Sequence, residues 1–428
     1  MGKPVVRVLV VTNDWEGAIN GGFLRWTEQP APDNTDDEKA AQFQLGEFVG
    51  VLQDTRWDGF DIEITRAHRT LPHPASAEDQ LKRSRGADLV GFRFHKGFQV
   101  NGENRQLSDY DMVLFFAISP DMSEDETEAE LKDEAEAIAR FMEKGGGFFA
   151  TGDHENYGRA LCKNIPRVRS MRRWYFGEPG PNGEPAAPSA LFADRHDTTR
   201  PGRDGSFIFE NQSDDIPQII EPTWYDNGHQ IAGGSAGTGK HPHPLLRSPD
   251  GTVIYLPDHM HEGLCEVPDN LSGRTFTIGD RTLAEYPVSP STGEPLAPEV
   301  VATGQVLGGH PTPALNSAVH TPATELSTSL TFGVICAWDG HRVGKGRVVV
   351  DSTFHHFVNI NLTGDFFLSQ VAGVAADDQR FYGFYVLAPQ SGMRVATREY
   401  LMIQWYYRNI VYWLIPQNRA LGKPMGRI

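Results

Sequence analysis

The chain has 428 residues, of which 39% are hydrophobic and 22% are charged, and these values are ordinary for a globular protein with a substantial core. Its formal net charge of −17 at pH 7 argues against binding to nucleic acid or to an anionic membrane, because attraction to phosphate groups requires a basic surface. No apolar stretch is long enough to span a membrane, and the start of the chain has no signal-peptide core, so we expect a cytoplasmic protein.

The first part of the chain alternates strand-like and helical segments. Continuous β-branched or apolar runs are typical of strands buried on both faces of a parallel sheet. Such runs predict strands at residues 5–12, 111–118 and 148–151, and residues 60–65 (FDIEIT) also predict a strand. Helices are expected at 37–53 and from Ser123, where a Ser-x-x-Glu capping pattern begins, to the glycines at 145–147. The alternation predicts an α/β protein with a doubly wound parallel sheet.

The rest of the chain divides into an insertion and a return to the core. Residues 165–329 are rich in Pro and Gly, and we expect an irregular β-containing insertion that covers the strand ends of a core begun by residues 1–164. Residues 330–428 are expected to complete that core, with a strand pair at 330–338 and 347–351. The aromatic segment 398–415 predicts a helix packed in the core; a dimer face, and hence a homo-oligomer, is the alternative.

Acid-plus-histidine clusters directly follow three of the apolar runs. They are Gly152-Asp153-His154-Glu155, Pro257-Asp258-His259-Met260-His261-Glu262 and Asp351-Ser352-Thr353-Phe354-His355-His356. In open α/β sheets the ends of the strands carry the loops that bind ligands and do chemistry. The three clusters therefore predict one shared polar site.

Two chemical schemes fit such a site, and the sequence does not choose between them. Without a metal, His154 or His355 would act as general acid or base and a neighbouring aspartate would orient it. The catalytic candidates are Asp153, His154, Glu155 and His355. With a divalent metal (Zn, Fe, Mn or Ni), imidazoles and carboxylates would hold the ion, and Glu155 or Glu262 would take a proton from its bound water. The metal-ligand candidates are Asp258, His259, His261 and Asp351. A third interpretation is structural, with these side chains capping helices and bonding loops.

Substrate contacts are expected around the same strand ends. Residues after the first strand and in a dense polar stretch of the insertion are candidates, although both segments also fit ordinary polar loops. The candidates are Asp14, Trp15, Glu16, Glu210, Asn211 and His356. The basic run 167–173 fits a solvated helix face or a set of internal ion pairs better than an anion site. No nucleotide cofactor is expected, because His241 replaces the Ser or Thr of a phosphate-binding loop and prolines follow it.

Three segments carry a resemblance to a known family. They are the strand 110–114 with its helix ending at 145–147, the strand-to-turn segment 148–154, and the run 344–350 leading to His355. Together they resemble the class I glutamine amidotransferase-like superfamily, most nearly its ThuA-like branch. The resemblance covers less than half of the chain and implies a flavodoxin-like sheet with the site at the strand ends.

The chain departs from that family at the nucleophile. Amidotransferases of this type place a catalytic cysteine at the turn after the strand that matches 148–151, and here that turn has none. Cys162, further along, is expected to be a structural thiol inside a helix. The three cysteines include no CxxC pair, so neither a zinc ribbon nor a disulfide framework is indicated.

The sequence thus favours an enzyme, a hydrolase or a lyase that does not use a cysteine to hydrolyse glutamine. Its substrate would be a small polar molecule, and the ThuA-like resemblance implies a sugar-like one. The alternative is a catalytically inactive binding or assembly protein that keeps the fold without the cysteine.

Overall fold

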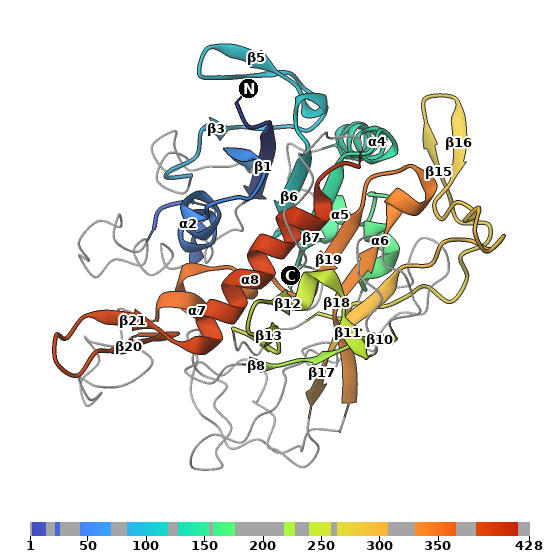
Figure 1. The fold of residues 1–428 in the computed structure, drawn as a ribbon. Helices are drawn as coiled ribbons and strands as arrows, with labels where there is room; N and C mark the ends of the chain where they lie inside the picture. Colours follow the sequence, from blue (N-terminus) through green and yellow to red (C-terminus); the bar gives the residue numbers. More distant parts are fainter. Residues whose placement is uncertain are drawn as a thin grey trace, which may run out of the picture.

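The computed structural model describes residues 2–13, 22–25, 43–69, 84–118, 127–153, 157–175, 218–226, 239–257, 263–306, 330–364 and 382–417. Its main sheet has nine strands in the order β3-β2-β1-β6-β7-β19-β18-β17-β9 (Figure 1). These strands are β1 (Val5–Asn13), β2 (Asp61–Arg69), β3 (Leu89–Val90), β6 (Met112–Phe116), β7 (Gly147–Thr151), β9 (Glu221–Pro222), β17 (Glu299–Val306), β18 (Leu330–Trp338) and β19 (Val348–Asp351).

The remaining described elements are helices, short turns and small hairpins. The helices are α2 (Gly46–Asp54), α4 (Glu128–Glu143), α5 (Arg159–Cys162), α6 (Val168–Met171), α7 (Asn359–Thr363) and α8 (Arg398–Leu414). The 3-10 turns are η3 (Leu107–Asp109), η4 (Pro244–Leu246), η5 (Gly340–Val343) and η6 (Phe354–His356). Two-stranded pairs are formed by β4 (Phe98–Val100) with β5 (Glu103–Arg105), β8 (Gln218–Ile219) with β14 (Tyr255–Leu256), β10 (Trp224–Asp226) with β11 (Lys240–Pro242), β12 (Arg247–Ser248) with β13 (Gly251–Thr252), β15 (Thr275–Ile278) with β16 (Arg281–Ala284), and β20 (Tyr385–Leu387) with β21 (Arg394–Ala396).

The strand order confirms the predicted doubly wound α/β fold. Strands β3, β2, β1, β6, β7 and β19 are parallel neighbours, and when the two-residue edge strand β3 is set aside the other five follow the flavodoxin-like order 2-1-3-4-5. Beyond β19 the sheet continues with antiparallel β18, β17 and β9. The pairing of β18 with β19 confirms the strand pair expected at 330–338 and 347–351. Strands β9 and β17 belong to the segment expected as an insertion, and both extend the main sheet.

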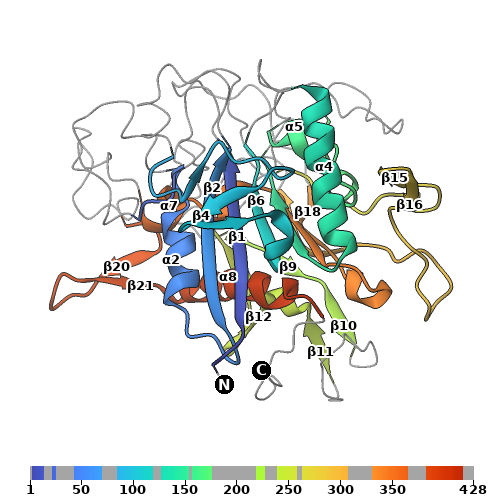
Figure 2. The ribbon, with the colours of Figure 1, turned by 90° about the horizontal axis from the view of Figure 1, so that it is seen from above.

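Alternating side chains of the parallel strands enter two cores on opposite faces of the sheet. Val8 and Val10 of β1 pack with the side chains of α2 and α8, whereas Leu9 and Val11 pack with those of α4. Figure 2 shows the same arrangement, with α4 on one side of the strands and α8 on the other. The aromatic helix α8 supplies buried residues to the first core, which confirms its predicted role as a core helix.

Two helix starts differ from the predicted ones, and capping explains one of them. Helix α4 begins at Glu128, because the Thr127 hydroxyl accepts a hydrogen bond from the Glu130 backbone N–H in a capping box. The same Ser/Thr-x-x-Glu pattern at Ser123 lies outside the described residues. Helix α2 begins at Gly46, after its predicted start, with Phe43 packed against the core before the first turn. The described helices include none with the length and apolar character needed to cross a membrane.

The basic run 167–173 is an internal ion-pair network, so the solvated helix face is wrong. Arg167 is fully buried and pairs with Glu143 at 2.7 Å between Nη2 and Oε1. Arg169 pairs with the buried Glu285 at 2.6 Å, and Arg173 pairs with Glu266 at 3.1 Å. These pairs fix the start of the 165–329 segment against α4 and the strands that follow.

Candidate functional site

The candidate site lies where two neighbouring parallel strands end. Asp351 is the last residue of β19 and pairs in register with Thr151, the last residue of β7. Asp153 follows β7 by two residues, and η6 follows β19. The backbone N–H of Phe354 donates to the Gly152 carbonyl at 2.7 Å, which joins the turn after β19 to the turn after β7. The clusters at 153 and 351–356 therefore meet, as the sequence predicts.

Gly152 makes this close approach possible. A Cβ atom at this position would lie 2.4 Å from the Tyr157 carbonyl oxygen and 2.7 Å from the Trp174 ring. Such contacts are shorter than packed atoms allow, so any side chain here would move the turn that carries Asp153.

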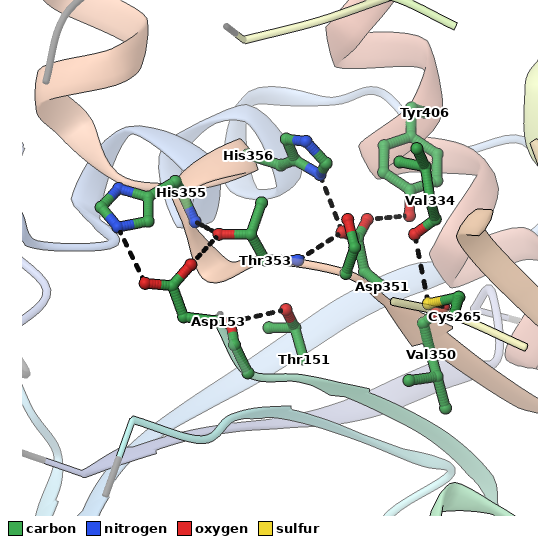
Figure 3. Close-up of polar contacts among 12 residues, drawn as sticks. Thr151, Asp153, Cys265, Val334, Val350, Asp351, Thr353, His355, His356 and Tyr406 are labelled. Carbon is green, nitrogen blue, oxygen red and sulfur yellow. Dashed lines mark hydrogen bonds and ion pairs between the residues drawn. The ribbon is translucent and has the colours of Figure 1, made fainter. Parts of the chain in front are cut away.

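Asp153 and His355 form a buried acid–imidazole pair (Figure 3). The distance from Asp153 Oδ2 to His355 Nε2 is 3.5 Å, and the two residues are only 3% and 2% exposed. The Thr353 hydroxyl donates to Asp153 Oδ1 at 2.8 Å and accepts from the His355 backbone N–H at 3.1 Å. The other ring nitrogen, Nδ1, lies 3.3 Å from Asn361 Oδ1. Both ring nitrogens thus face oxygen atoms, and the doubly protonated ring can donate to both.

Aromatic side chains enclose the His355 ring. The Phe354 ring stacks on it with centroids 4.2 Å apart, and the Phe43 ring meets it edge-on at 5.8 Å. An apolar enclosure lowers the local dielectric constant, which strengthens the interaction between the imidazole and the Asp153 carboxylate.

A second buried cluster, formed by Asp351, His356 and Tyr406, adjoins this pair and supports it. The fully buried Asp351 carboxylate accepts from His356 Nδ1 at 2.7 Å, from the Tyr406 hydroxyl at 2.5 Å and from the Thr353 backbone N–H at 3.2 Å. Burial, together with the charge of Asp351, raises the pKa of Tyr406 well above its ordinary value, so its hydroxyl remains a proton donor. Because Thr353 bonds to both aspartates, this cluster fixes the residue that orients Asp153 and His355.

Arg172 ties the two strand ends together from a third side. Its guanidinium is buried, stacks over the Trp174 ring at 4.4 Å and donates to the carbonyl oxygens of Asp153 and Ser352. A planar fork of donors can hold two backbone segments at once, which a lysine cannot do. Arg172 therefore fixes the spacing between the turns that carry Asp153 and His355.

The described residues include no group of three or more His, Cys, Asp or Glu side chains arranged to hold a metal ion. The Asp153 and His355 donors alone have a suitable spacing of 3.5 Å. Two ligands, each about 2.1 Å from a tetrahedral ion, lie roughly 3.4 Å apart. Asp351 uses its oxygens to accept hydrogen bonds from protein donors, so we do not retain it among the proposed metal ligands.

Four of the predicted site residues belong to the described part of the chain. Asp153 and His355 face each other, whereas Asp351 and His356 bind each other in the buried cluster below, so substrate contact by His356 gains no support. The others lie outside the described residues; they are Asp14, Trp15, Glu16, His154, Glu155, Glu210, Asn211, Asp258, His259 and His261. Gly263, one residue after the cluster at 257–262, donates its backbone N–H to the Ser352 carbonyl at 3.2 Å.

Cys162 is the last residue of α5 and is fully buried, which confirms its predicted place in a helix. Burial raises the pKa of its thiol far above the ordinary range, and the nearby charges of Arg172 and Arg69 offset only part of that rise. The thiol therefore stays protonated, which excludes it as a thiolate nucleophile.

Sequence reasoning missed four residues that shape the site: Thr353, Asn361, Tyr406 and Arg172. Thr353 stands inside a predicted cluster, where its hydroxyl could have been noticed. Asn361 lies in α7 and Tyr406 in α8, about 10 and 55 residues after the end of β19. No sequence pattern links either residue to that strand end. Arg172 has no sequence signal beyond its place in the basic run 167–173.

No known family model matches the chain, and a search of curated proteins finds no match either.

Proposed function

We propose that the chain is an enzyme that acts on a small polar substrate by hydrolysis or by another proton-transfer reaction. The observation that carries this proposal is the buried Asp153–His355 pair at the adjoining carboxyl ends of β7 and β19. Open α/β sheets bind ligands at this edge. An imidazole oriented by a carboxylate is the commonest general acid–base device in enzymes.

In this proposal His355 moves the proton and its neighbours hold it in position. Nδ1, the ring nitrogen that does not face Asp153, would take a proton from a water or a substrate hydroxyl and return it to the leaving group. Asp153 would stabilise the imidazolium that forms between these two steps, as its Oδ2 faces Nε2. The Thr353 hydroxyl occupies the other carboxylate oxygen, which leaves Oδ2 directed to the ring.

A metal-assisted form of the same proposal uses the cluster at 258–261. Asp153 and His355 have the spacing of two ligands of one ion, and Gly263 is fixed beside the end of β19. We propose His259, His261 and Asp258 as the further ligands of a divalent metal. Such an ion, when bound, lowers the pKa of its water.

The substrate class rests on the resemblance of three segments to the ThuA-like branch of the class I glutamine amidotransferase-like superfamily. The 2-1-3-4-5 order of the five longer parallel strands supports the fold that this resemblance implies, and the substrate class rests on the resemblance alone. We therefore propose a polyhydroxy, sugar-like substrate.

The proposal is tested by screening small polyhydroxy compounds, with their esters and glycosides, for product formation by NMR. His355→Gln and Asp153→Asn should each lower kcat/KM at least about 100-fold, the usual contribution of general acid–base catalysis. His341→Gln is the matched control, because His341 lies in η5 before the amino end of β19 and should leave kcat/KM unchanged. Turnover by His355→Gln at the rate of the unsubstituted protein would overturn the acid–base role.

Metal analysis of the purified protein separates the two forms of the proposal. One transition metal ion per chain that is lost on His259→Ala and His261→Ala substitution supports the metal-assisted form. A metal-free protein whose turnover survives both substitutions supports the form that uses Asp153 and His355 alone. Saturable binding of a screened compound without any turnover would favour the binding protein instead.

A further inference from the structure

A cavity of about 430 Å³ lies between α4 and the loop that precedes the β4–β5 hairpin. Small-molecule sites in proteins have volumes of roughly 300–1,000 Å³. The α4 side of the cavity extends to Lys144, before the amino end of β7, whereas Asp153 follows the carboxyl end of the same strand. The hairpin and α4 lie at the top of Figure 1. The cavity is thus separate from the candidate site.

The cavity has an apolar wall. Phe94, Leu107 and Phe141 line it, and they are only 1%, 6% and 6% exposed. These side chains belong to the core that α4 forms with the sheet, so the wall is rigid. A flat apolar group that lies against such a wall loses contact with water on the side that faces it.

The rim of the cavity carries two lysines whose ammonium groups form no ion pair within the described residues. Lys96 and Lys144 are exposed, and neither forms an ion pair with any residue of the described ranges. The chain as a whole has a net charge of −17, so a pair of available ammonium groups is a local exception that attracts anions. His95 also lines the cavity, and its buried Nδ1 has no hydrogen-bond partner among the described residues.

The acidic residues of the same wall do not cancel the attraction at Lys144. Glu136 accepts from Arg140 at 2.5 Å and from the Gly279 backbone N–H at 3.0 Å, so its charge is already engaged. Asp133 lies in α4, eleven residues before Lys144 at the end of that helix. At the rise of about 1.5 Å per residue of an α-helix, the two residues are roughly 16 Å apart along the axis. That distance exceeds the Debye length of about 8 Å at physiological ionic strength.

We propose that this cavity binds a small organic anion of the aromatic carboxylate class. The ring would lie on Phe94, Leu107 and Phe141, and the carboxylate would face Lys96 and Lys144. The site is independent of the acid–base pair at the strand ends, and its ligand need not be a substrate.

Benzoate is the probe, and isothermal titration calorimetry of the full chain is the measurement. We expect one saturable site with a Kd in the millimolar range or below, and a Kd at least fivefold higher for benzamide, which has the same shape without the charge. Lys144→Glu and Lys96→Glu should each raise the Kd for benzoate at least fivefold. Lys132→Glu changes the net charge equally on the same helix outside the cavity, and it should change the Kd less than twofold.

Filling the cavity is the second arm of the test. Ala137→Trp places a large ring inside it and should abolish benzoate binding, while circular dichroism and the melting temperature report whether the fold is kept. The absence of saturable benzoate binding, or binding that Lys144→Glu and Lys132→Glu weaken equally, would overturn the proposal. Inorganic phosphate binding as tightly as benzoate would also overturn it, because the apolar wall would then contribute nothing.

Discussion

Removal of the Tyr406 hydroxyl tests how the protein keeps a charged carboxylate in its interior. Asp351 is fully buried, and Tyr406, His356 and the Thr353 backbone donate to it. The substitution Tyr406→Phe removes one donor and changes the packing volume very little. Water cannot take the place of the hydroxyl, because both residues are fully buried. A hydrogen bond to a charged group contributes about 1.5–3 kcal/mol, so we expect the free energy of unfolding to fall by about 2–3 kcal/mol.

The next residue of α8 provides the matched control. Tyr407 is also fully buried, and its hydroxyl donates to the neutral backbone carbonyl of His356. A hydrogen bond between neutral groups contributes about 1 kcal/mol, so Tyr407→Phe should cost less than Tyr406→Phe. Urea denaturation followed by tryptophan fluorescence measures both values.

A double-mutant cycle makes the test specific to the Tyr406–Asp351 pair. Asp351→Asn keeps the shape of the side chain and removes its charge, and the two substitutions together should show a coupling energy of about 1 kcal/mol or more. A cost for Tyr406→Phe no larger than that for Tyr407→Phe, or additive effects in the cycle, would refute the idea that Tyr406 stabilises a carboxylate.

Three further predictions concern the fold outside the acid–imidazole pair. Burial alone would raise the pKa of Glu143, but hydrogen bonds from Lys345 and Arg167 outweigh burial and lower it, so Glu143→Gln should cost about 2 kcal/mol at pH 7. That difference should shrink as the pH falls below about 4.5, the ordinary glutamate value, because protonation removes the ion pairs; urea denaturation at pH 7 and pH 3 checks this. Cys162 should resist iodoacetamide in the folded protein and react only after unfolding, and mass spectrometry that finds rapid native labelling would contradict its burial. Gly346→Ala should destabilise the protein by about 2–3 kcal/mol, since its Cβ would lie 1.8 Å from a backbone oxygen; an unchanged melting temperature would contradict this packing.

The core of the fold could be predicted because its strands are continuous apolar runs. A strand buried on both faces, such as β1 or β6, has no polar alternation, and few other structures tolerate that pattern. The extension of the sheet by β17 and β9 could not be predicted, because a two-residue strand such as β9 has no periodicity and owes its place to pairing with β17. The capping patterns at Ser123 and Thr127 also show that two consecutive signals can compete for the start of one helix.

The convergence of Asp153 and His355 followed from one physical rule, that parallel strands end at the same edge of a sheet. The difference between His355 and its neighbour His356 did not follow from any sequence signal. One ring meets Asp153 and the other meets Asp351, because the turn at 354–356 directs consecutive side chains to different partners. Tyr406 and Arg172 arrive from distant segments, so only tertiary structure brings them to the site.

Asn359, the first residue of α7, forms three hydrogen bonds near the start of α2. Its side-chain oxygen accepts from the Glu47 backbone N–H, and its side-chain amide donates to the Leu24 carbonyl. Its backbone N–H donates to the Gln44 carbonyl. The turn that bears both histidines is therefore continuous with the first turn of α2 on one side and with α8 on the other. Local opening of either helix should release the histidine turn as well, so hydrogen exchange in these three segments should report one cooperative unit. A ligand at His355 would then protect amides in α2 that it never touches.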